Sequence, residues 1–315
     1  MVADTAAEPA AGEGFRHRAL LYRGTVEYRA AVRGYLRRGL ARAEPVLIAV
    51  PQRKVAWLRS ELKAESTEVA FADMTELGRN PARIIPALRA FMDRHAGQRV
   101  WCIAEPVWPG RSAAEMREAT RHEALVNTAF ARASASFLCL YDRAGLTQPV
   151  IADAARTHPA LLSQGEEQPS SGYLGPADLP PGCYHPLPAP PAYAETLVYQ
   201  RDLRPVRALV ARTARRARLP AGRITDLVLA VSELAANTLR HTRAGGTLHL
   251  WHNEHEILCQ IQDTGTIADP LAGYQPTASD VPGGMGLWLV NQVCDLVELR
   301  TSRAGTTICL HMRLN

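Results

Sequence analysis

Apolar and polar positions follow two different patterns along this 315-residue chain. In the first part, short apolar runs of strand length alternate with segments whose apolar residues recur at helical spacing. The expected strands are residues 46–50, 69–72, 100–104 and 137–141, and the expected helices are residues 26–42, 53–62, 81–94 and 113–131. Because strands that alternate with amphipathic helices build parallel sheets, this part is predicted to be a parallel α/β domain.

The pattern is lost between residues 161 and 192. Proline, glycine and serine crowd this segment, and neither helical nor strand spacing persists in it. Such a composition is typical of extended, fairly stiff connections. We therefore expect one domain at residues 15–160, a linker at 161–192 and a second domain at 193–315, preceded by a disordered tail at 1–14.

The second domain is expected to mix helices with antiparallel strands. The expected strands are residues 195–199, 247–251, 257–263, 297–301 and 306–312, and the expected helices are residues 205–218, 222–241 and 286–294. Helices and strands in this proportion indicate a two-layer α/β sandwich.

Composition narrows the class of protein. With 47% hydrophobic residues, 21% charged residues and a net charge of +5 that is spread along the chain, nothing points to nucleic-acid binding. No run approaches the ~18 apolar residues of a membrane span, and the N-terminus lacks the features of a signal peptide. The six cysteines form no Cys-x-x-Cys pair. We expect a reduced, cytoplasmic protein without direct nucleic-acid or membrane contacts.

The first candidate motif pairs Glu233 with Asn237, four residues apart on one face of an expected helix. An asparagine oxygen suits Mg²⁺, and a glutamate one turn away can accept a proton from a hydroxyl group. A solvated glutamate and an asparagine near a helix end are the alternative that this pair alone leaves open.

Two further motifs follow in a spacing that suits a nucleotide. Asp263 ends an apolar strand before Gly265, where an aspartate can accept from adenine N6 and a glycine lets the base approach. An ordinary strand-end turn is the alternative. The glycine-rich run at 283–286 leads into an expected helix, whose N-terminal amides favour phosphate. In this order, the three motifs predict a purine nucleotide site.

These residues carry a family resemblance. Glu233-x-x-x-Asn237, Asp263-x-Gly265, Gly284-Met285-Gly286-Leu287 and Gly305-Thr306-Thr307 resemble the N, G1, G2 and final strand motifs of the GHKL ATPase superfamily, whose ATP-binding unit is the Bergerat fold. The short form is similar to bacterial RsbW-like anti-sigma-factor serine kinases of the partner-switching type.

The resemblance implies a function and its residues. ATP and Mg²⁺ would be the cofactors, Asn237 the magnesium ligand and Glu233 the general base toward a serine. The remaining nucleotide contacts that it implies are Asp263, Gly265, Gly284, Met285, Gly286, Leu287 and Thr307. The implied partners are a sigma factor and an anti-anti-sigma (STAS) protein that carries the serine.

One departure leaves a second function open. Ile267 stands where the family usually has a second glycine, so the lid at residues 266–282 should begin less flexibly. An ATP-binding interaction module without kinase activity is therefore the alternative. A sensor histidine kinase is disfavoured, because His158 and His185 precede prolines and His122 lies inside the first domain. A DNA-binding regulator is disfavoured because we find no helix-turn-helix.

Two other groups of residues are assigned less specific roles. His249 and His252 would face opposite sides of a strand, which disfavours a zinc site there. An arginine-rich helix is interpreted as a solvated face, with a sigma-factor contact as a minor hypothesis. Its arginines are Arg204, Arg207, Arg212, Arg215, Arg216 and Arg218.

The first domain contains no Gly-x-x-x-x-Gly-Lys-Ser/Thr, so it should not bind ATP through a phosphate loop. Polar residues follow its expected strands, notably Glu105, with Trp108 and Arg111 in the same loop. A sensory pocket and a loop stabilised by an Arg–Glu pair are both open.

Segments of the first domain resemble the MEDS sensory family, a RecA-like sheet without the phosphate loop. They are Phe15-Arg16-His17 leading to Tyr22, residues 77–81 and residues 121–125. The family implies a small-molecule ligand. A MEDS domain joined to a GHKL domain resembles the RsbA type of anti-sigma factor regulator. The sequence leaves the ligand, the sigma factor and a possible homodimer open.

Overall fold

The computed structural model describes residues 14–62, 69–163, 166–176, 178–242, 244–275 and 285–314. The predicted tail therefore lies outside the described residues except for Gly14. The chain divides into two compact units, Met1–Cys183 and Tyr184–Asn315, which we describe separately.

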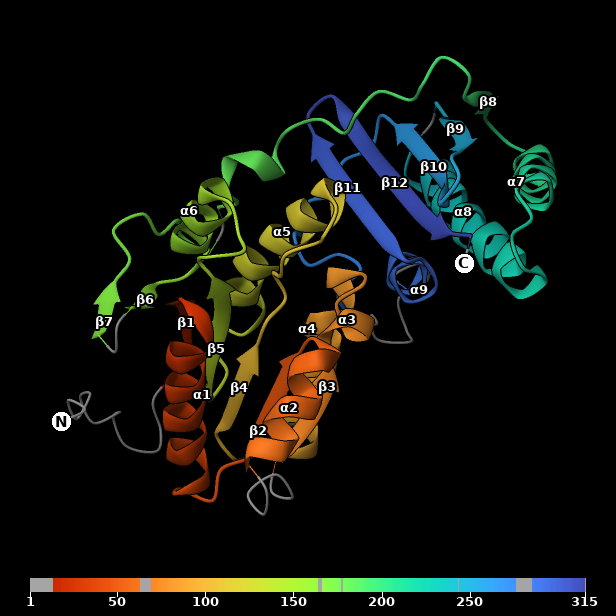
Figure 1. The fold of residues 1–315 in the computed structure, drawn as a ribbon. Coiled ribbons are helices and arrows are strands. Elements are labelled where there is room, and N and C mark those ends of the chain that lie inside the picture. Colours follow the sequence, from red (N-terminus) through yellow and green to blue (C-terminus); the bar gives the residue numbers. More distant parts are fainter. Residues whose placement is uncertain are drawn as a thin grey trace. The chain divides into compact units, whose positions relative to one another are not determined.

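The first unit is built on a seven-stranded sheet in the order β3-β2-β4-β5-β1-β6-β7 (Figure 1). Its strands are β1 (Arg16–Tyr22), β2 (Val46–Val50), β3 (Val69–Asp73), β4 (Val100–Ala104), β5 (Ala135–Asp142), β6 (Ala160–Ser163) and β7 (Glu166–Pro169). Six strands are parallel and only β7 pairs antiparallel, with β6. This confirms the predicted parallel α/β sheet. Strands β6 and β7 occupy the start of the segment that was expected to be linker.

Helices cover this sheet. Helices α1 (Gly24–Leu40) and α2 (Gln52–Leu62) bury apolar side chains on one face, against residues such as Leu20, Ile48 and Leu138. The remaining helices are α3 (Met74–Leu77), α4 (Ile84–Arg94), α5 (Ala113–Ala129) and α6 (Gln148–Thr157), with 3₁₀ turns η2 (Pro81–Arg83) and η3 (Pro181–Cys183). The helix that was expected from residue 81 begins with η2, where the Asn80 side chain accepts a hydrogen bond from the Ala82 amide as an N-cap.

The second unit is a five-stranded antiparallel sheet in the order β11-β12-β10-β9-β8. Its strands are β8 (Glu195–Tyr199), β9 (Gly246–His252), β10 (Glu256–Asp263), β11 (Leu296–Ser302) and β12 (Gly305–Arg313). Helices α7 (Arg204–Arg216), α8 (Ala221–His241) and α9 (Gly286–Val293) share one apolar core with the sheet. The two-layer sandwich is confirmed.

Two structural facts concern the cysteines and the apolar character of the helices. All six cysteines are buried and carry free thiols. Within the described part of the chain, no helix combines the length and the apolar character that a bilayer crossing requires.

The sheet of the second unit carries a charged network around His311, which is buried on β12. Its Nδ1 lies 3.0 Å from Glu256 Oε2, and its Nε2 lies 3.2 Å from Glu298 Oε1. Burial disfavours a charged imidazole and is the largest influence. Hydrogen bonds to Cys309, Glu256 and Glu298 together outweigh it and raise the pKa of His311 well above its ordinary value.

We expect this network to make the second unit less stable in alkaline solution. The contribution of a raised pKa is complete below about pH 6.5, the value for an unfolded chain, and is lost as the pH rises through the folded-state pKa. A tenfold difference in proton affinity between the folded and the unfolded chain corresponds to about 1.4 kcal/mol of unfolding free energy. Urea unfolding of the full chain between about pH 6 and 9 should show this loss, and His311→Gln should remove most of it. His255→Gln, an exposed control, should leave it unchanged; parallel pH profiles for wild type and His311→Gln would contradict the assignment.

Candidate functional site

The first motif lies on the long helix α8. Leu227, Val231 and Leu234 are buried in the core, which leaves Glu233 and Asn237 half-buried at its edge. A Cβ atom on Gly286, the first residue of α9, would lie 3.0 Å from Glu233 Oε2 and 3.2 Å from Asn237 Nδ2. The N-terminus of α9 therefore lies directly against the polar pair, whose side-chain ends would have to shift by a few tenths of an ångström to admit a Cβ atom.

The second motif is tied to the same helix. Asp263 Oδ2 accepts a hydrogen bond from Thr238 Oγ1 at 2.6 Å, and Oδ1 accepts one from the Gly265 amide at 2.8 Å. Because each carboxylate oxygen has two lone pairs, half-buried Asp263 can still accept from a further donor. These two bonds fix its orientation beside α8.

On the last strand, β12, Thr306 rather than Thr307 contacts the Asp263–Gly265 turn. Thr306 is paired with Asp263 in register, and its Oγ1 donates to the Gly265 carbonyl at 2.8 Å. Because neighbouring residues of a strand face opposite sides, Thr307 points to the other face of the sheet. Gly305 has φ +133°, and a Cβ there would lie 2.2 Å from the Asp263 carbonyl oxygen, so glycine is required before Thr306.

The described first part of the lid is attached to the domain. The Ile267 amide donates to Thr301 Oγ1 at 3.1 Å, and the Ile267 side chain packs against the core. Further along, the Gly273 carbonyl accepts from Asn291 Nδ2 of α9 at 3.0 Å. The residue that departs from the family pattern thus anchors the beginning of the lid.

The glycine-rich motif is described only from Met285 onward, so Gly284 lies outside the described residues. Met285 is the N-cap residue of α9 and is 47% exposed, whereas the Leu287 side chain is buried in the core. Leu287 can therefore offer only its backbone amide to a ligand. The first amides of a helix lack intrahelical partners and attract phosphate.

Sequence reasoning missed three contributors to this site. Thr238 and Thr306 bind the Asp263–Gly265 turn, and Arg240 donates to Asn237 Oδ1 at 2.7 Å. Thr306 lies within the Gly305-Thr306-Thr307 motif, but no spacing rule assigns a role to it or to Thr238, since both act through partners distant in sequence. Arg240 lies one turn beyond Asn237 on α8, so its reach could have been foreseen.

The residues present fit a nucleotide with magnesium. The donor set contains an amide oxygen at Asn237 and carboxylates at Glu233 and Asp263, which are hard oxygen ligands or acceptors. Gly286 forms a cradle that a Cβ would fill. This set would hold a divalent cation and phosphates near α9 and an amine-bearing base near Asp263.

The first unit places a different polar cluster where Glu105 follows β4. Lys54 Nζ lies 2.6 Å from Glu105 Oε1, and the Tyr22 hydroxyl donates to the same oxygen at 3.2 Å. Burial raises the pKa of Glu105, while Lys54 opposes that rise. Arg111 instead donates to the carbonyls of Pro106 and Gly78 and stacks on Trp108. Glu105 is thus held by a lysine, and the Trp108–Arg111 loop is held by backbone contacts.

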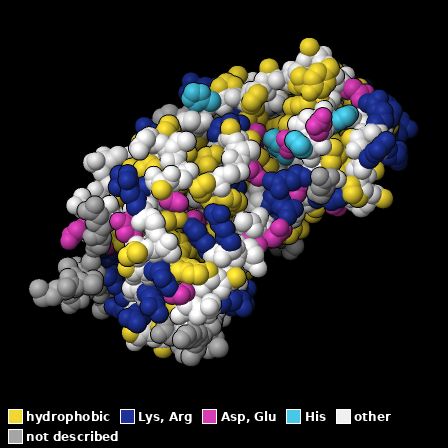
Figure 2. Space-filling model, in the orientation of Figure 1, with side chains coloured by type: hydrophobic (Ala, Val, Ile, Leu, Met, Phe, Trp, Pro, Cys, Tyr) yellow, Lys and Arg dark blue, Asp and Glu magenta, His cyan; other side chains and the backbone are white. Residues whose placement is uncertain are grey.

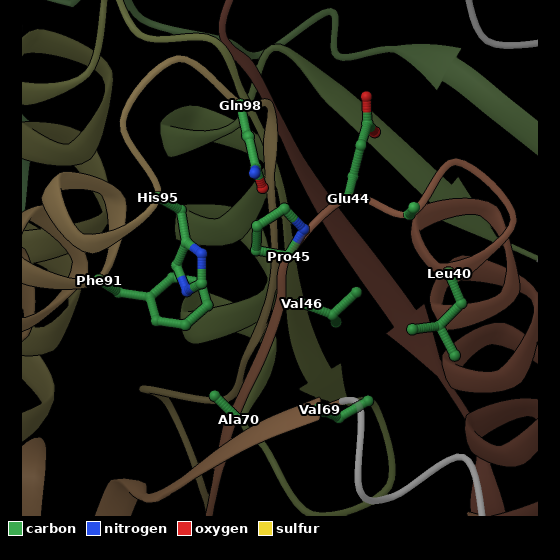
Figure 3. Close-up of a pocket in the computed structure, with 10 residues that line it drawn as sticks. Leu40, Glu44, Pro45, Val46, Val69, Ala70, Phe91, His95 and Gln98 are labelled. Carbon is green, nitrogen blue, oxygen red and sulfur yellow. The ribbon is translucent and has the colours of Figure 1, made fainter.

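Two further features lie on the surface, an open depression and a gathering of basic side chains. An open depression of about 580 Å³ lies beside the first residues of β2 and β3, and Pro45, Phe91 and His95 are among its lining residues (Figure 3). Lys and Arg side chains gather over α7 (Figure 2). Within that gathering Arg212 and Arg216 pair with Glu195, and Arg204 pairs with Asp202. Several arginines of α7 therefore have partners within the chain.

Comparison with known proteins defines the class that this fold and site represent. Residues 199–312 match the family described as histidine kinase-like ATPase domain, and residues 16–159 match MEDS, the MEthanogen/methylotroph, DcmR Sensory domain. The protein therefore joins a MEDS sensory domain to an ATPase domain of the GHKL type. An ATPase domain of this kind implies ATP binding.

Individual relatives extend the comparison. The chain is 32% identical over 91 residues to the serine-protein kinase RsbW of Halalkalibacterium halodurans, a match that covers 24% of this chain and 55% of that protein. A crystal structure of RsbU and RsbW domains from Mycobacterium tuberculosis matches with a TM-score of 0.31 and 18% identity, covering 39% of this chain and 33% of that one. The chain spans about half the length of the curated relative, and the structural match is too weak to carry an argument.

Proposed function

We propose that the protein is a signal-responsive anti-sigma regulator that binds Mg²⁺-ATP and phosphorylates a serine on an anti-anti-sigma partner of the STAS type. It would compete for a sigma factor in the alternative complex. The observation that carries the proposal is the meeting of Gly286 with Glu233 and Asn237, beside an Asp263 that is held by Thr238. The sequence likeness to a serine-protein kinase supports the same reaction class.

Each residue of the candidate site has a defined part in this proposal. Asp263 accepts from the amine of the purine, and Thr306 supports the turn at Gly265 where the sequence pointed to Thr307. Asn237 offers its oxygen to the magnesium ion, and the backbone of residues 284–287 contacts phosphate. When bound, Mg²⁺-ATP would supply the transferable phosphoryl group, and ADP would leave as its bond to that group breaks. Glu233 accepts the proton that leaves the partner's serine hydroxyl as the new phosphate ester bond forms.

Two observations favour a second candidate, an interaction module in which ATP shapes a binding surface without phosphoryl transfer. Arg240 holds the Asn237 oxygen that the magnesium ion would need, and Ile267 anchors the lid. A magnesium ion would have to share this oxygen with Arg240 or displace it, and the contacts of Ile267 restrain the start of the lid. In this module the bound nucleotide would control only which partner is held.

The first unit would supply the signal. We propose that a small molecule bound by the MEDS domain changes the choice between the two partners in the cytoplasm, and a homodimer is compatible with this scheme. Lys54 and Glu105, at the carboxyl end of the parallel strands, are the first residues to change when that ligand is sought.

Transfer of label from ATP separates the two candidates. The full chain is incubated with γ-labelled ATP, Mg²⁺ and each purified anti-anti-sigma protein of the source organism. We expect one partner to be labelled on serine, and the same partner with that serine changed to alanine to stay unlabelled. Bound nucleotide without labelling of any partner would support the interaction module and contradict the kinase.

A further inference from the structure

A second cluster of reactive side chains lies in the first unit, apart from the nucleotide site. His17, Glu123, Cys139 and His158 each turn one ligand atom inward, and these atoms all lie within 4.8 Å of one another. Glu123 Oε2 is 3.1 Å from His17 Nε2 and 3.0 Å from His158 Nε2, while Cys139 Sγ is 3.4 Å from His17 Nε2. All four residues are at most 4% exposed.

Four separate elements bring this cluster together. His17 is on β1 and Cys139 on β5, and the pairing of Ala19 with Cys139 puts both side chains on the same face of the sheet. Glu123 comes from α5, and His158 follows the last residue of α6. The cluster therefore lies between the sheet and two helices that cover it.

Hydrogen bonds determine which nitrogens carry protons. Asn127 donates its amide to the Thr157 carbonyl at 2.8 Å, so its Oδ1 faces His17 Nδ1 at 3.0 Å as an acceptor. His158 Nδ1 lies 2.8 Å from the Ala154 carbonyl, which can only accept. Both histidines therefore carry hydrogen on Nδ1, and in the neutral ring the Nε2 lone pairs point at the Glu123 carboxylate.

Few donors face these acceptors. The Cys139 thiol can donate to His17 Nε2, 3.4 Å away, but in the neutral rings neither Nε2 carries a hydrogen for the Glu123 carboxylate. Glu123 Oε1 has no hydrogen-bond partner among the described residues although it is fully buried, and His158 Nε2, which is also buried, lies 3.0 Å from the Glu123 carboxylate. Buried acceptors without donors are costly, so something positively charged is expected among them.

We propose that His17, Glu123, Cys139 and His158 bind a divalent zinc ion. Two imidazole nitrogens, a carboxylate oxygen and a thiolate are ligands that tetrahedral Zn²⁺ takes, with ligand atoms about 3.3–3.6 Å apart for bonds of about 2.0–2.3 Å. Asn127 and the Ala154 carbonyl hold the two rings from behind, as the outer partners of zinc-bound histidines do.

Charge supports the same ion. One Zn²⁺ with an ionised Glu123 and an ionised Cys139 is neutral, and binding releases the thiol proton to solvent. Two protonated imidazoles would instead leave like charges next to each other, with ring centroids 4.0 Å apart. Four protein ligands leave no open position, so the ion is structural and joins β1, β5, α5 and α6.

Metal analysis of the full chain tests this proposal independently of the nucleotide site. Protein purified without chelators should contain one zinc per chain. After metal removal and addition of Co²⁺, it should show the visible bands of a tetrahedral site and a thiolate-to-cobalt charge-transfer band. Cys139→Ser should lose the charge-transfer band, whereas Cys102→Ser, at a neighbouring buried thiol, should keep it.

A positioning variant adds a second readout. Asn127→Ala should weaken zinc binding about 10–100-fold and keep the thiolate band, because it loosens His17 without removing a ligand. Wild-type protein that neither contains nor takes up a metal ion would overturn the proposal, as would a cobalt spectrum unaffected by Cys139→Ser. Iron in place of zinc, with the same dependence on Cys139, would overturn the identity of the ion.

Discussion

Replacing Asp263 by asparagine is expected to weaken ATP binding about 10–100-fold while the domain stays folded. Asp263 already accepts from Thr238 Oγ1 and from the Gly265 amide, one on each oxygen. An asparagine has one acceptor oxygen and would turn its NH₂ toward one of these donors or toward the purine amine. Losing a charge-assisted hydrogen bond costs about 1.5–3 kcal/mol, and tenfold in affinity is about 1.4 kcal/mol.

Calorimetric titration with a non-hydrolysable ATP analogue measures this effect. Asp269→Asn provides a matched control, because it makes the same change at an exposed aspartate of the lid. The control should bind as the wild type does. If Asp263→Asn bound within a few-fold of the wild type, the purine would have to lie elsewhere.

The second large effect concerns the proton acceptor. Glu233→Gln is expected to slow phosphorylation of the partner serine by about 10²–10⁴-fold with little change in ATP affinity. Glutamine keeps the shape of the side chain beside Gly286 but cannot take up a proton at neutral pH. Labelling rates at saturating ATP, together with a separate binding titration, distinguish a lost base from a lost site.

Glu254→Gln, an exposed residue of the turn between β9 and β10, is the control for this substitution. Equal loss of rate and of ATP affinity in Glu233→Gln would show that Glu233 acts in binding. An unchanged rate would assign the proton to another acceptor.

Regular elements with an apolar face were predictable, and those with buried polar residues were not. The apolar runs of β2 and β4 and the amphipathic faces of α1 and α4 identified these elements from sequence. Strand β1 was missed because its first residues, Arg16, His17 and Arg18, do not follow an apolar pattern. His17 and Arg18 are nevertheless buried, because partners such as Glu123 and Ser136 come from distant segments.

The predicted linker also contains strands that its sequence pattern did not indicate. Residues 160–163 and 166–169 pair with each other as β6 and β7 next to β1. The apolar run of β6 is only three residues long and β7 begins with three polar residues, so neither segment shows a strand pattern. Backbone pairing with an existing sheet edge stabilises such strands, and that edge exists only after the chain has folded.

The sequence by itself predicted two domains and the local segments of the candidate nucleotide site. The spacing of Glu233 and Asn237 follows from helix geometry, and the Asp263–Gly265 turn follows from a strand end, so both are properties of short segments. Only the tertiary structure decided that Thr306 rather than Thr307 supports that turn, that Arg240 holds Asn237, and that four distant residues meet around Glu123. The physical reason is that these contacts depend on strand register and helix packing, which join residues far apart in the chain.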